Sequence, residues 1–409
     1  MVPQKTRRLA TALMLALAVA APVAAQSSFG NDERFDSEFY GDLRTRSGDR
    51  LYNGRDPSST GYAAAASPQT AAAQKAYSNI TQTASVPNEY IPWSGAWWPR
   101  ATCELSFHSF EGGLSPLEKY DSIVASLYGR LPGAAAWEAD PVNHHNYASA
   151  STSVDWGGHC NGLAAAGILA PEPKKPFDVS LGNKPIKVKL TIAGAKAAKE
   201  YLYSDGQNDY RQLDNPSKSI KLTVADMKGL LSETYMTCNT QQFANRKTLG
   251  TRYDRNSIDL NDESFRDIYP HYFHWMLQQY VKKNGMAVVA EIDANRAVNN
   301  HPLFKYQSSA AYVPAQRKYS VTTVCTFTHY AKDPNFVGTN TMTRTYTYDL
   351  FQDAGGRVVR GEWTGKSVKD HPDFCWIPTS DAPAYATLEN QAINGDFVRW
   401  MYSRYGKAQ

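Results

Sequence analysis

The stretch that decides the fold is Ser153–Gly167, with the sequence SVDWGGHCNGLAAAG. Gly157 and Gly158 let the backbone turn tightly, and a cysteine, Cys160, follows almost at once. The small residues after it are typical of a short helix packed closely against its neighbours, and we expect that helix over Cys160–Leu169. The cysteine then lies at a helix N-terminus, where unpaired N–H groups and the helix dipole stabilise a thiolate. The pattern therefore predicts a nucleophilic thiol.

The first 25 residues have the features of a secretory signal peptide. A positive region (Lys5–Arg8) precedes an apolar stretch (Leu9–Ala21), and small residues before Gln26 suit cleavage after Ala25. The apolar stretch is too short to span a bilayer, and no later segment is apolar enough to cross one. We therefore expect a secreted protein, extracellular or periplasmic, with no membrane span.

The cysteine count supports a free thiol in such a compartment. The five cysteines are Cys103, Cys160, Cys238, Cys325 and Cys375. In an oxidising compartment an odd number leaves one over, and the nucleophile pattern favours Cys160. We expect a Cys325–Cys375 disulfide, because these two flank the strand-rich part of the chain. That pairing leaves Cys103 with Cys238, although the sequence alone leaves other pairings open.

Composition divides the chain into unlike parts. Of its 409 residues, 42% are hydrophobic and 12% aromatic, enough for most of the chain to bury a core. Residues 26–87 are polar and then rich in Ala, Ser, Thr and Gln, with no lasting period of 2 or 3.6. This predicts a low-complexity linker or pro-segment there. We expect the catalytic domain over residues 88–409, where aromatic residues are frequent.

The charge balance bears on the class of partner. The net charge is +4, from 43 basic and 39 acidic residues. Three of the basic residues lie in the expected signal peptide, which has no acidic residue, so the mature chain has 40 basic residues against 39 acidic ones. A near-neutral chain argues against a nucleic-acid binder that works through a basic field. The sequence does not define the oligomeric state.

The order of the expected elements predicts an α+β protein. Helical spacing predicts helices over Ser115–Tyr128, after Thr223 and over Phe273–Val281. The expected strands are Met286–Ile292, Tyr319–Tyr330, Thr341–Phe351 and Arg357–Trp363, the last two joined by a turn at Asp353–Gly356. Helices come first and antiparallel strands later. With a nucleophile at a helix N-terminus, this order favours a papain-like or transglutaminase-like core.

A thiol nucleophile needs a base and, usually, a group that orients the base. His274 precedes a strand that ends at Asp293, a separation that suits a histidine and a carboxylate on adjacent elements. We therefore expect a catalytic set of Cys160, His274 and Asp293. The rival pair is His329 with Asp349, on two successive expected strands, and the choice between the histidines stays open.

Four blocks of sequence, in order, resemble the secreted elicitor-type transglutaminases known from oomycetes and bacteria. They are Trp93–Pro99; Asp155–Ala164; Phe273-His274 with the strand to Asp293 and Val298–Pro302; and Tyr348–Leu350, Gly361–Trp363 and His371–Trp376. The resemblance implies acyl transfer from a protein-bound glutamine, through a cysteine acyl-enzyme, to a lysine amine. Cys160 matches the nucleophile position of that family.

The resemblance also implies partners and a possible cofactor. The partners are protein substrates that carry glutamine and lysine side chains, and calcium dependence is a family trait, but no metal ligands can be assigned from the sequence. We expect Trp156, Gly158 and Trp98 to contribute to the substrate site, with tryptophans that exclude water. Asn299 stands where the family has tryptophan in the peptide that plants detect.

Two other functions fit the same residues. A secreted papain-like cysteine peptidase or amidase uses the same acyl-enzyme with water as the acceptor. A non-catalytic secreted binding protein on the same scaffold would keep the fold and lack the chemistry. Activity that depends on Cys160 separates the two enzymes from the binding protein, and incorporation of an amine separates the two enzymes.

Overall fold

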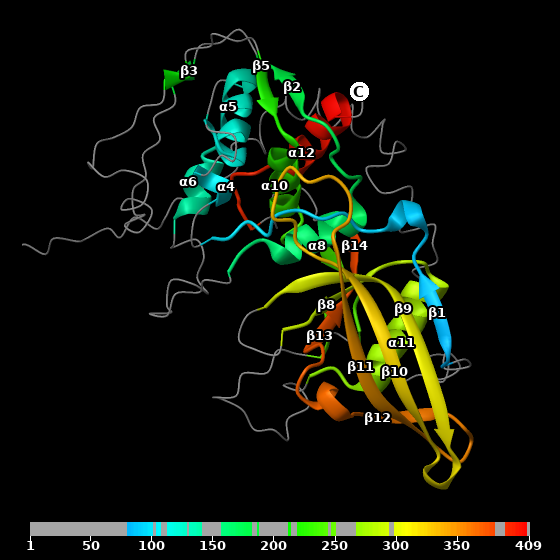
Figure 1. Cartoon of the computed structure of the whole chain (residues 1–409). Coiled ribbons are helices and arrows are strands. Elements are labelled where there is room, and N and C mark those ends of the chain that lie inside the picture. Colours follow the sequence, from blue (N-terminus) through cyan, green and yellow to red (C-terminus); the bar gives the residue numbers. More distant parts are fainter. Residues whose placement is uncertain are drawn as a thin grey trace, which may run out of the picture.

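A computed structural model describes residues 80–100, 104–107, 113–128, 131–140, 157–181, 186–187, 212–213, 219–243, 247–250, 267–293, 298–380 and 389–406. The expected signal peptide and most of the expected linker lie outside these residues. Figure 1 shows most of the helices at one end of the molecule and the large sheet at the other, with helix α8 where the two meet. In the described part of the chain, no helix is both long enough and apolar enough to cross a membrane.

The helices confirm the predicted helical segments closely. They are α4 (Glu104–Phe107), α5 (Pro116–Tyr128), α6 (Ala134–Ala139), α8 (Cys160–Leu169), α10 (Val224–Thr234), α11 (Pro270–Met276) and α12 (Gly395–Met401), with short 3-10 or π segments η3 (Asn88–Tyr90), η6 (Leu277–Lys283), η7 (Pro314–Gln316), η8 (Gly365–Val368) and η9 (Tyr402–Gly406). A capping box starts α5, because Ser115 N donates to Glu118 Oε2 (2.7 Å) and Glu118 N donates to Ser115 Oγ (3.2 Å). Ser115, the first residue of the predicted segment, therefore caps this helix.

The large sheet is antiparallel and runs in the order β12-β11-β10-β9-β8-β13-β7, with β1 also paired to β9. Its strands are β1 (Gln82–Ser85), β7 (Leu249–Gly250), β8 (Val288–Glu291), β9 (Asn300–Val313), β10 (Lys318–Thr328), β11 (Thr341–Gln352), β12 (Val358–Trp363) and β13 (Phe374–Trp376). Three small sheets pair β2 (Phe177–Ser180) with β5 (Ser219–Leu222), β3 (Ile186–Lys187) with β4 (Gln212–Leu213), and β6 (Asn239–Thr240) with β14 (Pro378–Ser380). The α+β class, with helices first and a large antiparallel sheet after them, is as predicted.

Strand β1 extends the sheet into the segment that composition assigns to a linker. Residues Gln82–Ser85 pair with Ser308 through Lys305 of β9. Figure 1 shows β1 alongside β9 at the edge of the sheet. The folded part of the chain therefore begins before residue 88.

Glycines let α8 approach its neighbours closely. A Cβ atom at Gly162 would lie 2.0 Å from Ser232 O of α10, and one at Gly158 would lie 2.6 Å from the ring of Trp97. Real Cβ atoms do not approach backbone or ring atoms so closely. A larger residue at Gly162 would therefore force α8 away from α10, and one at Gly158 would displace Trp97. The close packing expected from the small residues of this helix is therefore observed.

The expected Cys325–Cys375 disulfide is absent, because both residues are buried free thiols. Cys325 lies on β10, Cys375 lies on β13, and strands β9 and β8 lie between them. Three strand spacings amount to about 14 Å along the sheet. A disulfide requires Cα atoms no more than about 7 Å apart. The other expected pairing involves Cys103, which lies outside the described residues.

Candidate active site

Cys160 is the first residue of α8, and its thiol faces the start of β9. The residue is 5% exposed. Its Sγ donates to Val298 O at 3.4 Å and accepts from Asn300 Nδ2 at 3.5 Å. Cys160 lies in the first turn of α8, where the backbone N–H groups have no partner within the helix. The predicted nucleophile thus lies at a helix N-terminus and remains a free thiol.

An indole orients the amide that meets the sulfur. Trp376 Nε1 donates to Asn300 Oδ1 at 2.9 Å, so the amide nitrogen of Asn300 is turned toward Cys160. Trp376 ends β13 and Asn300 begins β9, and both strands pair with β8. The sheet therefore fixes the geometry of this donor. Neither residue was expected in the site, although Asn300 and Trp376 both fall in the blocks that carry the resemblance.

A second set of polar side chains runs from the sulfur to Asp293. The Tyr330 hydroxyl contacts Cys160. It also lies 3.4 Å from Asn299 Oδ1, and Asn299 Nδ2 donates to Asp293 Oδ2. Burial, followed by the neighbouring Cys160, raises the pKa of Tyr330 well above its usual value, so the hydroxyl stays protonated and can donate. The structure therefore links the predicted Asp293 to Cys160 through two intervening side chains.

Glu291 holds the backbone that carries these groups. It is fully buried at the end of β8, and its Oε1 accepts from Asp293 N at 2.9 Å and Asn299 N at 3.2 Å. Burial raises the pKa of Glu291 to about 8, and the nearby charge of Asp373 adds to this effect. The Glu291 carboxyl group therefore accepts hydrogen bonds from the backbone at both ends of the connection between β8 and β9.

His274 lies far from the nucleophile. Its Nδ1 lies 2.6 Å from the hydroxyl oxygen of Tyr348. That hydroxyl lies 2.7 Å from Thr323 Oγ1, and Thr323 Oγ1 lies 2.9 Å from Ser308 Oγ on β9. Ser308 is eight residues along β9 from Asn300, the residue that contacts the sulfur. At about 3.3 Å per residue, that separation is about 26 Å. The structure therefore does not bring the predicted base to the predicted nucleophile.

The rival pair is also separated. Asp349 accepts from Lys318 Nζ at 2.7 Å and from Ser320 Oγ at 2.8 Å, near the start of β10. His329 follows the other end of β10, about 30 Å away at the rise of a strand. It lies beside Tyr330, with ring centroids 5.7 Å apart. His329 is therefore near the site, whereas its expected carboxylate is not.

A third histidine lies closer to the site than either candidate. His301 follows Asn300, and its ring centroid is 4.4 Å from that of Tyr330. Its Nδ1 donates to Thr328 O at 3.0 Å, and burial lowers its pKa to about 4, so the ring is neutral at neutral pH. The adjoining asparagine and proline gave no reason to select this histidine from the sequence.

The three residues expected to bind substrate lie in different surroundings. Trp98 is completely buried, so its indole belongs to the core and cannot wall a substrate site. Gly158 is buried, packs under Trp97 and forms an isolated bridge with Pro99, so it shapes the turn before the nucleophile. Trp156 lies outside the described residues. Half-buried Trp97 replaces Trp98 as the aromatic residue beside the site.

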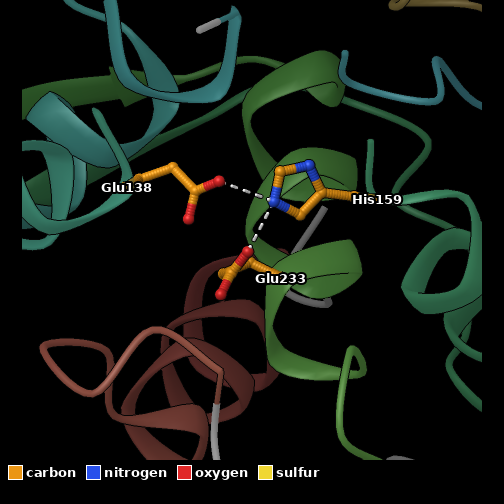
Figure 2. A group of neighbouring side chains, drawn as sticks. All are labelled: Glu138, His159 and Glu233. Carbon is orange, nitrogen blue, oxygen red and sulfur yellow. Dashed lines mark ion pairs between the residues drawn. The ribbon is translucent and has the colours of Figure 1, made fainter. Parts of the chain in front are cut away.

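His159, the residue before the nucleophile, points into a separate buried cluster. Figure 2 shows its Nε2 facing two carboxylates, at 3.1 Å from Glu138 Oε1 and 2.8 Å from Glu233 Oε2. Its Nδ1 lies 2.9 Å from Trp98 O. Burial by itself would lower the pKa of His159, but the charges of Glu138 and Glu233 outweigh it and raise the pKa to about 10. These carboxylates come from α6 and α10, and no sequence spacing predicts the cluster.

Calcium does not fit this cluster. Within the described ranges, Glu138, His159 and Glu233 are the one group of His, Cys, Asp or Glu side chains close enough to share an ion. Calcium takes six to eight oxygen ligands, whereas this buried group offers a nitrogen and two carboxylates. No step of the chemistry is therefore assigned to calcium.

The comparisons with known proteins agree with the resemblance. Residues 334–402 match the model of the Transglutaminase elicitor family. This match confirms the predicted resemblance over a segment that contains β11, β12 and Trp376 but not Cys160. The crystal structure of the GP42 transglutaminase from Phytophthora sojae is similar in fold, with a TM-score of 0.55 and 17% sequence identity over 81% of this chain and 94% of that chain. No curated protein matches the sequence.

Proposed function

We propose that this chain is an exported transglutaminase that forms isopeptide bonds through an acyl-enzyme on Cys160. The observation that carries the proposal is a free thiol at the first residue of α8, faced by the Asn300 amide. The match to the Transglutaminase elicitor family and the GP42-like fold support this reaction class. The proposed core is papain-like or transglutaminase-like, within residues 88–409 and with β1 added to its sheet.

The reaction requires two acyl transfers at one sulfur. The thiolate of Cys160 attacks the carboxamide carbon of a glutamine side chain, and the departing nitrogen takes up a proton and leaves as ammonia. A lysine amine then attacks the thioester, forms the isopeptide bond and returns the thiol. The helix N-terminus stabilises the attacking thiolate, which is more nucleophilic than a thiol.

Asn300 and Tyr330 supply neutral donors where negative charge develops. Both contact the sulfur, so each lies near the carbon that the sulfur attacks. Preorganised donors of this kind stabilise a tetrahedral oxyanion because they do not reorganise during the reaction. Trp376 is a positioning residue, since it acts through Asn300. Asp293 is proposed as a second positioning residue, since it acts through Asn299 and Tyr330.

Aromatic residues near the sulfur favour an amine over water as the acceptor. Trp376 is 7% exposed, and Trp97 is half-buried over the turn that precedes Cys160. Indole surfaces exclude water and accommodate the alkyl stem of a lysine. The peptidase alternative has the same nucleophile and lacks this argument for an amine acceptor.

The test uses the purified chain with a glutamine-bearing protein and a labelled primary amine, with and without added calcium. We expect amine incorporation and ammonia release that fall by about 10⁴-fold or more in Cys160→Ala, because the nucleophile is lost. Glu362→Gln, at an exposed position on β12, is the matched control and retains activity. Ammonia release or peptide cleavage without incorporation would instead assign a hydrolase.

Export is tested separately from chemistry. The proposal places the mature N-terminus at Gln26, after removal of the expected signal peptide. N-terminal sequencing of the protein recovered outside the cytoplasm measures this directly. A mature chain that still begins at Met1 would contradict export by a cleaved signal. Limited proteolysis of residues 26–87 with activity measured before and after then tests a pro-segment against a spacer.

A further inference from the structure

The cluster beside the nucleophile brings together three side chains from separate elements. Glu138 comes from α6, His159 is the N-cap of α8, and Glu233 comes from α10. They are 6%, 1% and 1% exposed, so no bulk water screens their charges. Figure 2 shows both carboxylates converging on one nitrogen of the imidazole ring. Two acids meeting one buried nitrogen require a positive charge between them.

One proton on Nε2 cannot form a well-aligned hydrogen bond to both carboxylates. The two carboxylate oxygens lie 3.1 and 2.8 Å from Nε2, on two sides of it, so one N–H group cannot point at both. An N–H group points along one direction, whereas these oxygens flank it on two sides. A metal ion bound to the same nitrogen would meet both oxygens from that side. The off-axis placement is therefore that of neighbouring ligands around an ion.

The other ring nitrogen of His159 already forms a hydrogen bond. His159 Nδ1 lies 2.9 Å from Trp98 O, and a carbonyl oxygen only accepts, so Nδ1 carries a proton and donates it. Metal-binding histidines commonly donate their second ring N–H to a carbonyl in this way, which leaves Nε2 to bind the ion. A backbone carbonyl thus orients the ring for coordination through Nε2.

We propose that Glu138, His159 and Glu233 bind one Zn²⁺ ion. One imidazole nitrogen and two carboxylate oxygens are ligands that Zn²⁺ accepts. Zinc bonds of about 2.0–2.2 Å separate neighbouring ligand atoms by about 3 Å, which matches the distances around Nε2. All three ligand atoms lie within 4.8 Å of one another. The two carboxylates balance the charge of the ion.

Neighbouring residues contact both carboxylates and hold them in place. Arg100 Nε lies 3.6 Å from Glu138 Oε1, and Asn390 N donates to Glu233 Oε1 at 3.1 Å. Because Asn390 binds the outer oxygen of Glu233, its Oε2 stays directed at His159. Supporting contacts of this kind orient metal ligands and raise affinity.

The site is structural and goes beyond the proposed acyl transfer, because Cys160 is not a ligand. The ion would join α6, α8 and α10 at the residue that precedes the nucleophile. Its role is to fix the start of α8, and its presence is measurable without any assay of activity. Failure of this proposal therefore leaves the transglutaminase proposal standing, and the reverse also holds.

The experiment measures metal in the untagged full-length chain, expressed with added zinc and purified by gel filtration. Elemental mass spectrometry should find about one Zn²⁺ per chain in the wild type. Glu138→Gln and Glu233→Gln should each hold at least tenfold less, because each loses a charged ligand. Cys160→Ala and Glu362→Gln are the matched controls and should keep the full amount.

Cobalt substitution keeps the test decisive if a variant fails to fold. Co²⁺ bound to the wild type should give visible bands of nitrogen and oxygen coordination without a thiolate charge-transfer band. A thiolate band, a wild type without stoichiometric zinc, binding of Ca²⁺ in place of zinc, or full zinc retention in both glutamine variants would each overturn the proposal. In the case without metal, the cluster is an ion-pair cluster with a doubly protonated His159.

Discussion

His159 and Cys160 are neighbours in sequence, yet they belong to two unlike polar clusters. The sulfur meets neutral donors, the Asn300 amide and the Tyr330 hydroxyl. The imidazole meets two buried carboxylates, Glu138 and Glu233. An N-cap residue lies outside the helix, whereas the next residue belongs to its first turn, so the two side chains leave the backbone in different directions. One glycine-rich turn thereby places a thiol in one cluster and an imidazole in the other.

The two clusters should affect different properties of the protein, the reaction rate around Cys160 and the stability around His159. Neutral donors around a thiol carry no charge that a partner must balance, so they remain available to a substrate. Buried charges are costly to leave uncompensated, so the His159 cluster resists any change in its members. We expect substitutions around Cys160 to change rates and substitutions around His159 to change the free energy of unfolding.

The largest expected effect is on stability. Glu233→Gln should lower the free energy of unfolding by about 3–5 kcal/mol, because it removes one charge from a buried, compensated group. Cys160→Ala, one residue from His159, should lower it by about 1 kcal/mol. Urea unfolding followed by circular dichroism measures both. Equal losses in the two variants would contradict the division between the clusters.

A pH dependence should follow from the group that caps α6, the helix that carries Glu138. Asp121 accepts from Ala134 N at 2.8 Å and Ala135 N at 3.1 Å, and burial raises its pKa from 3.8 to about 7. Between these values the folded chain holds a proton that the unfolded chain has lost. The stabilisation is therefore complete below pH 4 and is lost as the pH rises to about 7.

Asp121→Asn tests that dependence, because an amide does not titrate. The free energy of unfolding of the wild type, relative to the variant, should fall by about 3–4 kcal/mol from pH 4 to pH 7, in proportion to the pKa change. Urea titrations at four pH values give the difference. Parallel curves for the two proteins would mean that Asp121 is ionised in the fold, with its charge held by the α6 N–H groups.

Around Cys160 the expected effect is kinetic. Asn300→Ala should lower kcat for amine incorporation by about 10²-fold with little change in KM, because the lost donor acts on the transition state. Trp376→Phe should lower kcat by about tenfold, since it removes only the N–H that orients Asn300. Steady-state kinetics at saturating glutamine substrate separate kcat from KM. A rise in KM alone would assign Asn300 to substrate binding.

Local sequence signals predicted the helices well, including the helix that begins at Cys160. Caps, apolar spacing and small residues are encoded within a few positions, so the segments at Ser115, Cys160 and Thr223 form as expected. The long strand β9 was missed, because Pro302 and the run Ser308–Ala311 lower its β-propensity. Pairing on both sides outweighs that local preference, and only the sheet reveals it.

The side chains that contact Cys160 depend on non-local pairing, which spacing along the chain does not encode. Asn300 and Trp376 meet because β9 and β13 both pair with β8, although 76 positions separate the two residues. The cluster of His159 joins three helices in the same way. The expected histidine was chosen by its distance in sequence from Asp293, and that distance does not report which way α11 faces.

The smallest expected effect on activity is therefore at His274. The Nε2 atom of His274 accepts a hydrogen bond from Gln278 Nε2 at 3.0 Å, and its Nδ1 donates to the Tyr348 hydroxyl. Both ring nitrogens of His274 are therefore hydrogen-bonded within the core. Burial lowers the pKa of His274 to about 3, which keeps the ring neutral. His274→Gln should leave kcat within about twofold while the free energy of unfolding falls by about 1–3 kcal/mol, the cost of unmet buried hydrogen bonds.

A His301→Gln variant, measured beside it, compares a histidine near the sulfur with one that contacts Tyr348 on the far part of the sheet. If His274→Gln abolishes amine incorporation in a chain that is still folded by circular dichroism, the proton path runs through α11 and the assignment of donors at Cys160 is wrong. If only stability falls, His274 is a core residue that joins α11 to β11 through Tyr348. The sheet then contributes to the chemistry only at the end where β9 meets α8.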